Sequence, residues 1–208
     1  MRTLNFYRCA SVAGLCMLVF LAGCTGVSPK ADFYTLSTDS GTSALPEAAQ
    51  RCGDTPVDIG PVTWPRYLDQ PRIVTRTSPN RLEFDEFQRW GGSLQDDFSR
   101  VLIKNLSGLL QSERIGTFDR SSRTNPDYRV GVNVRQFDGQ LGGVVTLDAR
   151  WEIVRQETDE VLVVKNSLLQ ETATEATYDA LVNASSRAVA GLAREIAAAL
   201  LRECPDKQ

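Results

Sequence analysis

The side chains with the most reactive chemistry in this sequence are five cysteines, which fall into two groups along the chain. Cys9, Cys16 and Cys24 lie close to the N-terminus, whereas Cys52 and Cys204 lie near the two ends of the remaining chain. The sequence contains no histidine, which removes the commonest general base, the usual zinc ligand and every Ser-His or Cys-His nucleophile. No CxxC spacing is present. We therefore expect the thiols to carry acyl groups or to form disulfides, and we expect no enzymatic activity, no metal and no cofactor.

Residues 1–23 have the features of a secretory signal peptide that is removed. Arg2 and Arg8 make its start positive, and an almost uninterrupted apolar run follows over residues 10–22. A membrane-spanning helix needs about 20 apolar residues, so this shorter run is typical of a signal rather than of a permanent anchor. The run closes with Leu21-Ala22-Gly23-Cys24, which resembles the lipobox of bacterial lipoproteins, whose cysteine is acylated and becomes the first mature residue. The alternative is an ordinary signal peptide in which Cys24 lies near the cleavage site by chance.

The predicted lipid on Cys24 indicates where the protein is held. The lipoprotein pattern implies a diacylglyceryl group and an N-linked acyl chain such as palmitate, and two or more chains give stable membrane attachment. Thr25, rather than aspartate, follows the cysteine, which favours the outer membrane over retention in the inner membrane. Residues 24–31 form a short polar tether. We therefore expect a domain held close to the periplasmic face of the outer membrane.

Cys52 and Cys204 are the two cysteines that remain for a disulfide. They follow a secretory signal, and the periplasm is an oxidising compartment in which such pairs form and persist. A bond between them closes a loop of roughly 150 residues and stabilises the fold by about 4–5 kcal/mol, because it constrains the unfolded chain. Cys52 and Cys204 are therefore a possible disulfide, and two unpaired thiols are the alternative.

Alternation of apolar and polar residues predicts that much of the chain forms β-strands. Single strands are predicted at residues 32–36, 57–62, 127–138, 144–155 and 161–171. Pro61 interrupts the second of these and indicates an edge position or a bulge. Residues 72–77 and 81–85 are predicted to pair as a hairpin with one buried face. The last three strands follow one another directly, so we expect an antiparallel meander with one dry face.

Two stretches change to the three- and four-residue spacing of an amphipathic helix. The first begins near Ser93, a predicted N-cap, and its apolar stripe consists of Leu94, Phe98, Val101, Leu102, Leu106, Leu109 and Leu110. The second runs from about Thr177 to Glu203 and is stopped by Pro205. This order predicts an α+β fold with one domain over residues 32–204 and a tail at residues 205–208. Its sheet is expected to be mixed and mostly antiparallel, with two long helices packed on one face.

Charged and aromatic residues concentrate between residues 64 and 97, and each set there has two interpretations. Glu83, Asp85 and Glu86 could act with Asp96 or Asp97 in acid–base chemistry, but the solvated end of a strand accounts for them more simply. The arginines and aromatic residues of the same segment are either solvent-facing residues of the hairpin or the polar rim of a protein–protein interface. The residues of this possible partner or self-assembly surface are Trp64, Arg66, Tyr67, Leu68, Asp69, Arg72 and Arg76. The formal net charge of −3 gives no electrostatic basis for binding nucleic acid.

Seven short motifs, spread over nearly the whole mature chain, form a recognisable order. They are Phe33-Tyr34-Thr35-Leu36, Gly60-Pro61-Val62, the run from Tyr67 to Arg76, Asn80-Arg81-Leu82-Glu83-Phe84, Arg89-Trp90, Leu147-Asp148-Ala149-Arg150-Trp151 and Tyr178-Asp179-Ala180-Leu181-Val182. Their order resembles the PqiC (YmbA-type) lipoproteins, which are described as ABC-type transport auxiliary lipoproteins. The resemblance implies a non-enzymatic role beside an MCE-domain protein, which forms a hydrophobic tunnel for lipid traffic across the periplasm. It also implies a homo-oligomeric ring.

The main hypothesis is therefore an auxiliary or docking subunit of an MCE-type, ABC-associated lipid transport system, anchored to the outer membrane. The alternative is a lipoprotein that binds lipid or a small ligand on its own. That second function predicts an apolar cavity between the sheet and the helices.

Overall fold

The computed structural model describes residues 29–39, 52, 55–118 and 126–204. Its contacts divide the chain into two units, residues 1–30 and residues 31–208, and nearly every described residue belongs to the second unit. The predicted signal peptide, the lipobox with Cys24, and the tail at residues 205–208 lie outside the described residues. The architecture that follows is therefore that of the second unit.

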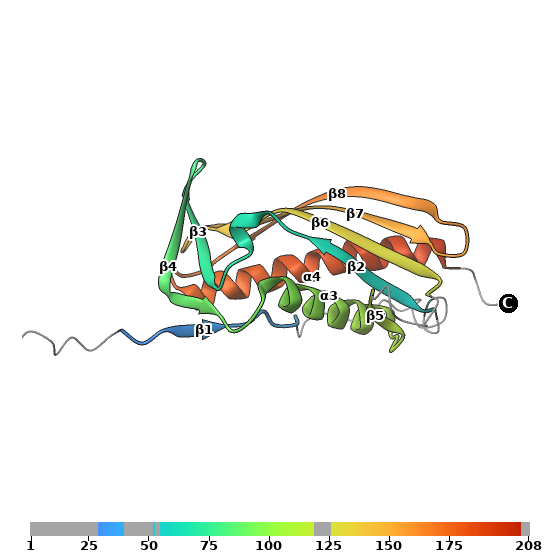
Figure 1. The fold of residues 1–208 in the computed structure, drawn as a ribbon, viewed down its shortest axis with the longest axis horizontal. Helices are drawn as coiled ribbons and strands as arrows, with labels where there is room; N and C mark the ends of the chain where they lie inside the picture. Colours follow the sequence, from blue (N-terminus) through green and yellow to red (C-terminus); the bar gives the residue numbers. More distant parts are fainter. Residues whose placement is uncertain (1–28, 40–51, 53–54, 119–125, 205–208) are drawn as a thin grey trace, which may run out of the picture. The chain divides into compact units, whose positions relative to one another are not determined.

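Three long antiparallel strands form the predicted meander (Figure 1). They are β6 (Tyr128–Gly139), β7 (Val144–Arg155) and β8 (Glu160–Thr172). Alternate residues of β7, from Val145 to Ile153, are at most 1% exposed, and the residues between them are partly or fully exposed; Val154, where the β7–β8 register shifts, is buried as well. The predicted meander and its single dry face are confirmed, because a period of two places every second side chain on the same side of a strand.

The other five strands extend this meander into a mixed eight-stranded sheet. They are β1 (Asp32–Tyr34), β2 (Val57–Thr63), β3 (Arg72–Ser78), β4 (Arg81–Trp90) and β5 (Ile115–Thr117). β2 runs parallel to both β5 and β6, and β1 runs parallel to β4. The longest ladders, those of the meander, are antiparallel. The mixed α+β sheet expected from the sequence is thus confirmed.

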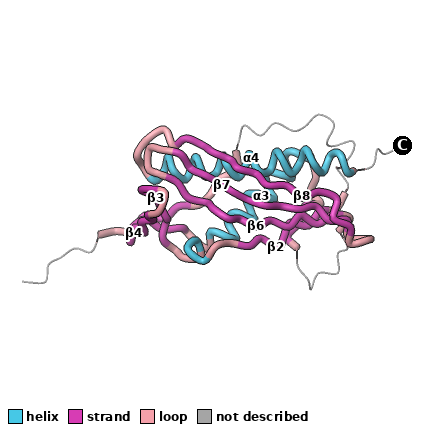
Figure 2. The backbone as a smooth tube through the Cα atoms, turned by 90° about the horizontal axis from the view of Figure 1, so that it is seen from above, coloured by secondary structure: helices cyan, strands magenta, loops and turns pink. Residues whose placement is uncertain are grey.

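Both long helices cover the same face of the sheet (Figures 1 and 2). α3 (Leu94–Leu110) begins at Ser93, whose hydroxyl accepts a hydrogen bond from the backbone N–H of Asp96. α4 (Tyr178–Glu203) begins in the same way, with the Thr177 hydroxyl accepting from the N–H of Ala180. These caps satisfy amides that a helix leaves without an internal partner, and the apolar stripes of both helices are buried. Both predicted helices are confirmed.

The region from β2 to β5 differs from the sequence-based expectation in three details. The β2–β6 register shifts between Ile59 and Val62, which confirms the bulge interpretation of Pro61. The short strand β5, after α3, was not predicted. One buried face for the hairpin was wrong, because β3 buries the consecutive residues Ile73, Val74 and Thr75 and β4 buries only Trp90. β3 pairs with β6 only at Thr75 and Gly139, and the hairpin projects away from the two helices (Figure 1), so the helices do not cover its turn end.

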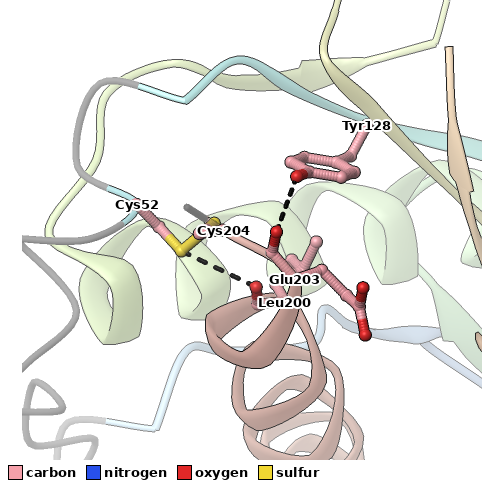
Figure 3. The surroundings of a disulfide bond; sticks show 5 residues. All are labelled: Cys52, Tyr128, Leu200, Glu203 and Cys204. Carbon is pink, nitrogen blue, oxygen red and sulfur yellow. Dashed lines mark hydrogen bonds between the residues drawn. A yellow bond between two sulfur atoms is a disulfide. The ribbon is translucent and has the colours of Figure 1, made fainter. Parts of the chain in front are cut away.

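The C-terminal end of α4 is joined covalently to the segment before β2 (Figure 3). Cys52 and Cys204 form a disulfide across 152 residues of sequence, with their Cα atoms 5.7 Å apart, and both are buried. The Tyr128 hydroxyl donates a 2.8 Å hydrogen bond to the Glu203 carbonyl oxygen, which ties the start of β6 to the same helix end. Sγ of Cys52 also lies 3.8 Å from the Leu200 carbonyl oxygen.

Reduction of the Cys52–Cys204 disulfide is expected to lower the free energy of unfolding by about 4–5 kcal/mol, because the unfolded chain regains the entropy of a very long loop. Urea denaturation of the oxidised and the dithiothreitol-treated protein measures the difference. The double variant Cys52→Ser/Cys204→Ser is the control, since its midpoint must not respond to dithiothreitol. Equal midpoints for oxidised and reduced protein contradict the prediction.

Candidate functional site

The residues between Trp64 and Arg76, which we call the Trp64–Arg76 block, occupy the connection from β2 to β3 and the start of β3. A short 3-10 turn, η1 (Arg66–Leu68), lies in the connection. The structure places the block's residues in different environments. Leu68 is only 4% exposed and belongs to the core, and Trp64 and Tyr67 pack against that core. Arg66 and Asp69 are exposed.

Trp64 forms the floor of this region by packing against two core aromatic rings. Its ring contacts Phe98 edge-on at 5.2 Å between centroids and Phe137 at 5.9 Å. Its Nε1 is buried and has no hydrogen-bond partner among the described residues. A cavity of about 290 Å³ adjoins it, lined by Trp64, Leu68, Asp69, Gln70, Pro71, Gly92, Ser93, Leu94 and Gln95. The cavity thus separates the block from the first turn of α3.

Tyr67 and Arg76 converge on one buried carboxylate, that of Asp138 near the end of β6. The Tyr67 hydroxyl donates to Oδ2 of Asp138 at 2.7 Å. Arg76 donates from Nε to Oδ1 at 2.7 Å and from Nη2 to Oδ2 at 2.9 Å, and Gln136 adds a bond to Oδ1 at 2.9 Å. The Asp138 side chain has no exposed area, so these donors replace its hydration.

The pKa values of this cluster follow from burial and from the shared hydrogen bonds. Burial by itself raises the pKa of Asp138, but the bonds from Arg76, Tyr67 and Gln136 outweigh it and hold that pKa below its ordinary value. Burial and the bond to the carboxylate raise the pKa of Tyr67. The bond to Asp138 raises the pKa of Arg76. Asp138 therefore stays ionised and its donors stay protonated, which is the state expected of a structural ion cluster.

Arg72 links the block to the outer strand of the hairpin. Its Nη1 lies 2.6 Å from Oε1 of Glu86, and its guanidinium lies 5.4 Å from the centre of the Phe84 ring. Both Arg72 and Glu86 are substantially exposed, so screening by solvent makes this pair a weak contributor to stability. Arg72 consequently remains available to a partner in a way that Arg76 does not.

Two of the acidic residues considered for acid–base chemistry make local contacts with donors. Asp85 accepts bonds from the backbone N–H groups of Phe87 and Gln88, at 2.8 and 3.2 Å, and from the Tyr178 hydroxyl at 3.3 Å. Asp97, on α3, pairs with Arg100. Across the described parts of the chain, no cluster of three His, Cys, Asp or Glu residues could hold a metal ion. No helix in those parts is long and apolar enough to cross a membrane.

Two sets of exposed apolar residues were missed by the sequence interpretation. One consists of Phe33, Phe84 and Phe87 on β1 and β4, and the other of Val144, Val161, Val164 and Leu168 on β7 and β8. The β8 set had a signal in the sequence, because Val161-Leu162-Val163-Val164 places apolar residues on both faces of a strand whose helix-facing side needs only half of them. Phe33 and Phe87 carried no comparable signal, since an aromatic residue in a strand is more often buried.

Residues 34–197 match the family described as the ABC-type transport auxiliary lipoprotein component. The chain belongs to this family. The match begins within β1 and ends within the last two turns of α4, so it covers almost the whole described domain. The resemblance inferred from the motif order is confirmed, and the chain is a lipoprotein component of a transport system. A comparison with curated proteins gives no match.

Solved structures show the same fold at low sequence identity. An uncharacterized protein is 18% identical with a TM-score of 0.67, and the alignment covers 83% of this chain and 99% of that one. Protein XCC0632 from Xanthomonas campestris, of the DUF330 family, is 15% identical with a TM-score of 0.67 over 82% and 95% of the two chains. Identities this low support the fold alone.

The Asp138 cluster predicts a specific pattern of stability losses. Arg76→Ala is expected to cost about 3 kcal/mol, because removing one partner leaves a buried carboxylate uncompensated. Tyr67→Phe removes one hydrogen bond to a charged group, which is worth about 1.5–3 kcal/mol. The matched control is Arg81→Ala, whose exposed pair with Glu83 is worth about 0–1 kcal/mol. Urea denaturation at pH 7 measures all three, and a loss at Arg76 no larger than that at Arg81 contradicts the assignment.

The same cluster sets the sign of a pH effect. The folded-state pKa of Asp138 lies below its unfolded value of about 3.9. The contribution of the ionised carboxylate to the free energy of unfolding is therefore complete above that pH and is lost as the pH falls through the folded pKa. Asp138→Asn is therefore less stable than the native protein at pH 7, and the difference narrows on acidification.

Proposed function

We propose that the protein is held by a lipid on Cys24 at the periplasmic face of the outer membrane. There it acts as a docking subunit of an MCE-type lipid transport system. The observation that carries this proposal is the family match over residues 34–197, which identifies a lipoprotein component of ABC-type transport. The lipobox at Leu21-Ala22-Gly23-Cys24 supports the anchor, and Thr25 supports the outer membrane. On this proposal residues 1–23 are removed, residues 24–31 are the tether and residues 32–204 are the working domain.

The absence of histidine and the use of the acidic residues in local contacts favour docking over catalysis. Asp85, Asp97 and Asp138 each accept hydrogen bonds from neighbouring backbone or side-chain donors. Arg66 and Asp69, in contrast, are exposed at the η1 turn beside the Trp64 cavity. Exposed charges next to a partly buried tryptophan form the kind of rim and pocket that protein partners bind. We assign the partner surface to Arg66 and Asp69, with Trp64 as the cavity floor.

A stand-alone lipid-binding function requires an apolar cavity between the sheet and the helices. In the described residues that layer is filled by large side chains such as Phe98, Leu102, Leu147 and Trp151, each at most 1% exposed. A cavity of about 400 Å³ does lie between β7, β8 and α4, but Lys165, Arg194, Glu195, Arg202 and Glu203 line it beside Trp151 and Val163, so it is not the apolar cavity that this function requires. No specific observation therefore favours this alternative over docking.

The anchor predicts a change of cell fraction on mutation. Cys24→Ala removes the thiol that is acylated, so the protein should move from the membrane fraction to the soluble periplasm or remain as an unprocessed precursor. Immunoblotting of fractionated cells measures the distribution, and mass spectrometry of the native protein detects the acyl chains. Globomycin, which blocks lipoprotein signal cleavage, should cause precursor accumulation only with Cys24 present. Cys24→Ala protein of mature size that stays in the membrane fraction contradicts the anchor.

The partner surface predicts a loss of capture on charge reversal. Arg66→Glu/Asp69→Lys keeps the net charge and changes only exposed groups, so the fold should be retained while capture by the MCE-domain partner falls at least tenfold. The matched control is Lys104→Glu/Glu157→Lys, which reverses two exposed charges elsewhere. Pull-down from detergent extracts measures capture, and light scattering measures whether self-assembly changes. If capture of the partner is undiminished and the mass of the assembly is unchanged, Arg66 and Asp69 form neither a partner surface nor a self-assembly surface. Tyr67 is unsuitable for this test because its hydroxyl supports Asp138.

A further inference from the structure

Two exposed phenylalanines lie side by side on β1 and β4. Phe33 is 67% exposed and is aligned with Arg89 in the parallel β1–β4 register. Phe87 is 41% exposed and lies two residues before Arg89, within the irregular part of β4 between Phe84 and Arg89 where the β3–β4 register shifts. Diagonal neighbours on adjacent strands are about 7–8 Å apart, so the two rings form one small apolar surface. We call Phe33 and Phe87 the aromatic pair.

The opposite side of the same two strands faces the domain, which holds the aromatic pair outward. The Tyr34 hydroxyl donates to Oε1 of Gln88 at 2.6 Å, and the Tyr34 ring packs against Tyr178 at the start of α4. Trp90, aligned with Tyr34, is buried. Because residues alternate along a strand, fixing Tyr34, Gln88 and Trp90 inward keeps Phe33 and Phe87 directed away from the core. Figure 1 shows β1 running beside the lower part of β4.

The length of the tether limits how far the aromatic pair can be from the lipid. Nine peptide units separate Cys24 from Phe33, and a fully extended chain spans at most about 3.3–3.6 Å per residue. Phe33 therefore cannot be more than about 30 Å from a lipid carried on Cys24. A surface tethered this closely meets the bilayer at high effective concentration, so even a weak affinity for lipid is sufficient to keep it bound.

The charges around the aromatic pair suit a bilayer of largely zwitterionic headgroups. Glu86 lies 2.6 Å from Arg72 and 3.8 Å from Arg89, while Asp32 accepts a hydrogen bond from Gln88 and Asp85 accepts from the N–H of Phe87, so each of these carboxylates has a local donor. Aromatic side chains bury apolar area in the headgroup region without needing an anionic surface. By contrast, the exposed Val161 lies near the start of β8, beside the β7–β8 turn. That turn is at the opposite end of the domain from β1, which follows the tether (Figure 1).

We propose that Phe33 and Phe87 insert among the lipid headgroups of the membrane that carries the anchor. The lipid on Cys24 restricts the distance of the domain from the bilayer, and the aromatic pair fixes which end of the domain faces it. This proposal rests on lipid attachment at Cys24 as proposed above. A bilayer surface is the occupant because of the short tether, the neutral charge balance and the position of the pair directly after the tether.

The test is depth-dependent quenching with the chain anchored chemically. The protein beginning at Cys24 is coupled through that thiol to a maleimide lipid in phosphatidylethanolamine–phosphatidylglycerol vesicles with or without brominated acyl chains. Cys52 and Cys204 are buried in a disulfide and do not react. Phe33→Trp and Phe87→Trp each add one fluorophore to the same native background. We expect the brominated lipid to reduce the added emission at least by half at both positions.

Val161→Trp is the matched control, because it adds a similarly exposed tryptophan on β8 at the opposite end of the domain. The emission of this tryptophan should hardly change with brominated lipid. Quenching at Phe33 and Phe87 but not at Val161 supports the proposal. No quenching at the aromatic pair, or equal quenching at all three positions, overturns the proposal. It is also overturned if Phe33→Ser/Phe87→Ser loses capture of the MCE-domain partner while the tryptophan variants at these positions show no quenching. The chemical coupling does not depend on acylation in the cell, so a failure here is distinct from a failure of the Cys24 anchor.

Discussion

Helix α4 packs small side chains directly against the dry face of the β6–β8 meander, and this contact orders the rest of the domain. Ala184, Ala188 and Ala197 are fully buried, and Gly191 faces Leu169 of β8, where an added Cβ atom would lie 3.4 Å from the Leu169 side chain, an ordinary van der Waals distance. The small side chains of the helix leave the layer to the large side chains of the sheet, above all Trp151. The Trp151 Nε1–H donates to Ser167, whose hydroxyl donates to Glu195 of α4, so this buried indole N–H is satisfied.

The two ends of α4 are held by different chemistry. At the C-terminal end the constraint is covalent, through Cys204, and is supported by the bond from Tyr128 to the Glu203 carbonyl. At the N-terminal end it is polar: burial and the nearby Asp85 carboxylate raise the pKa of Tyr178 to about 12, so its hydroxyl remains a donor to Asp85 at every physiological pH. A helix of 26 residues spans about 39 Å, so it connects the β1–β4 end of the domain rigidly to the disulfide end.

Much of this could be predicted from local pattern, and the remainder depends on contacts that local pattern does not encode. The helices and the meander follow from periodicity and from the caps at Ser93 and Thr177, and their observed bounds lie within a few residues of the expected ones. The parallel pairing of β2 with β6 joins segments about 70 residues apart, and no local signal specifies it. For the candidate site, exposure of Arg66 and Asp69 agreed with their residue types. The roles of Tyr67 and Arg76 were not predictable, because they depend on Asp138, whose carboxylate comes from a distant strand.

This dependence on Asp138 changes how the arginines and aromatic residues of the Trp64–Arg76 block are interpreted. A buried carboxylate with three side-chain donors specifies where β3 leaves the sheet, since any other register leaves the charge without partners. Residues used in this way contribute to the fold, and binding surfaces must be sought among exposed residues instead. Besides the apolar residues exposed on β7 and β8, such residues form two sets, the η1 turn with Arg66 and Asp69 and the aromatic pair on β1 and β4. Phe33 lies on β1 and Phe87 on β4, whereas η1 precedes β3, which lies on the other side of β4 from β1 in the sheet order. A domain seated on the bilayer through β1 would therefore keep the η1 turn accessible to a partner, and the anchor and the docking surface can act at the same time.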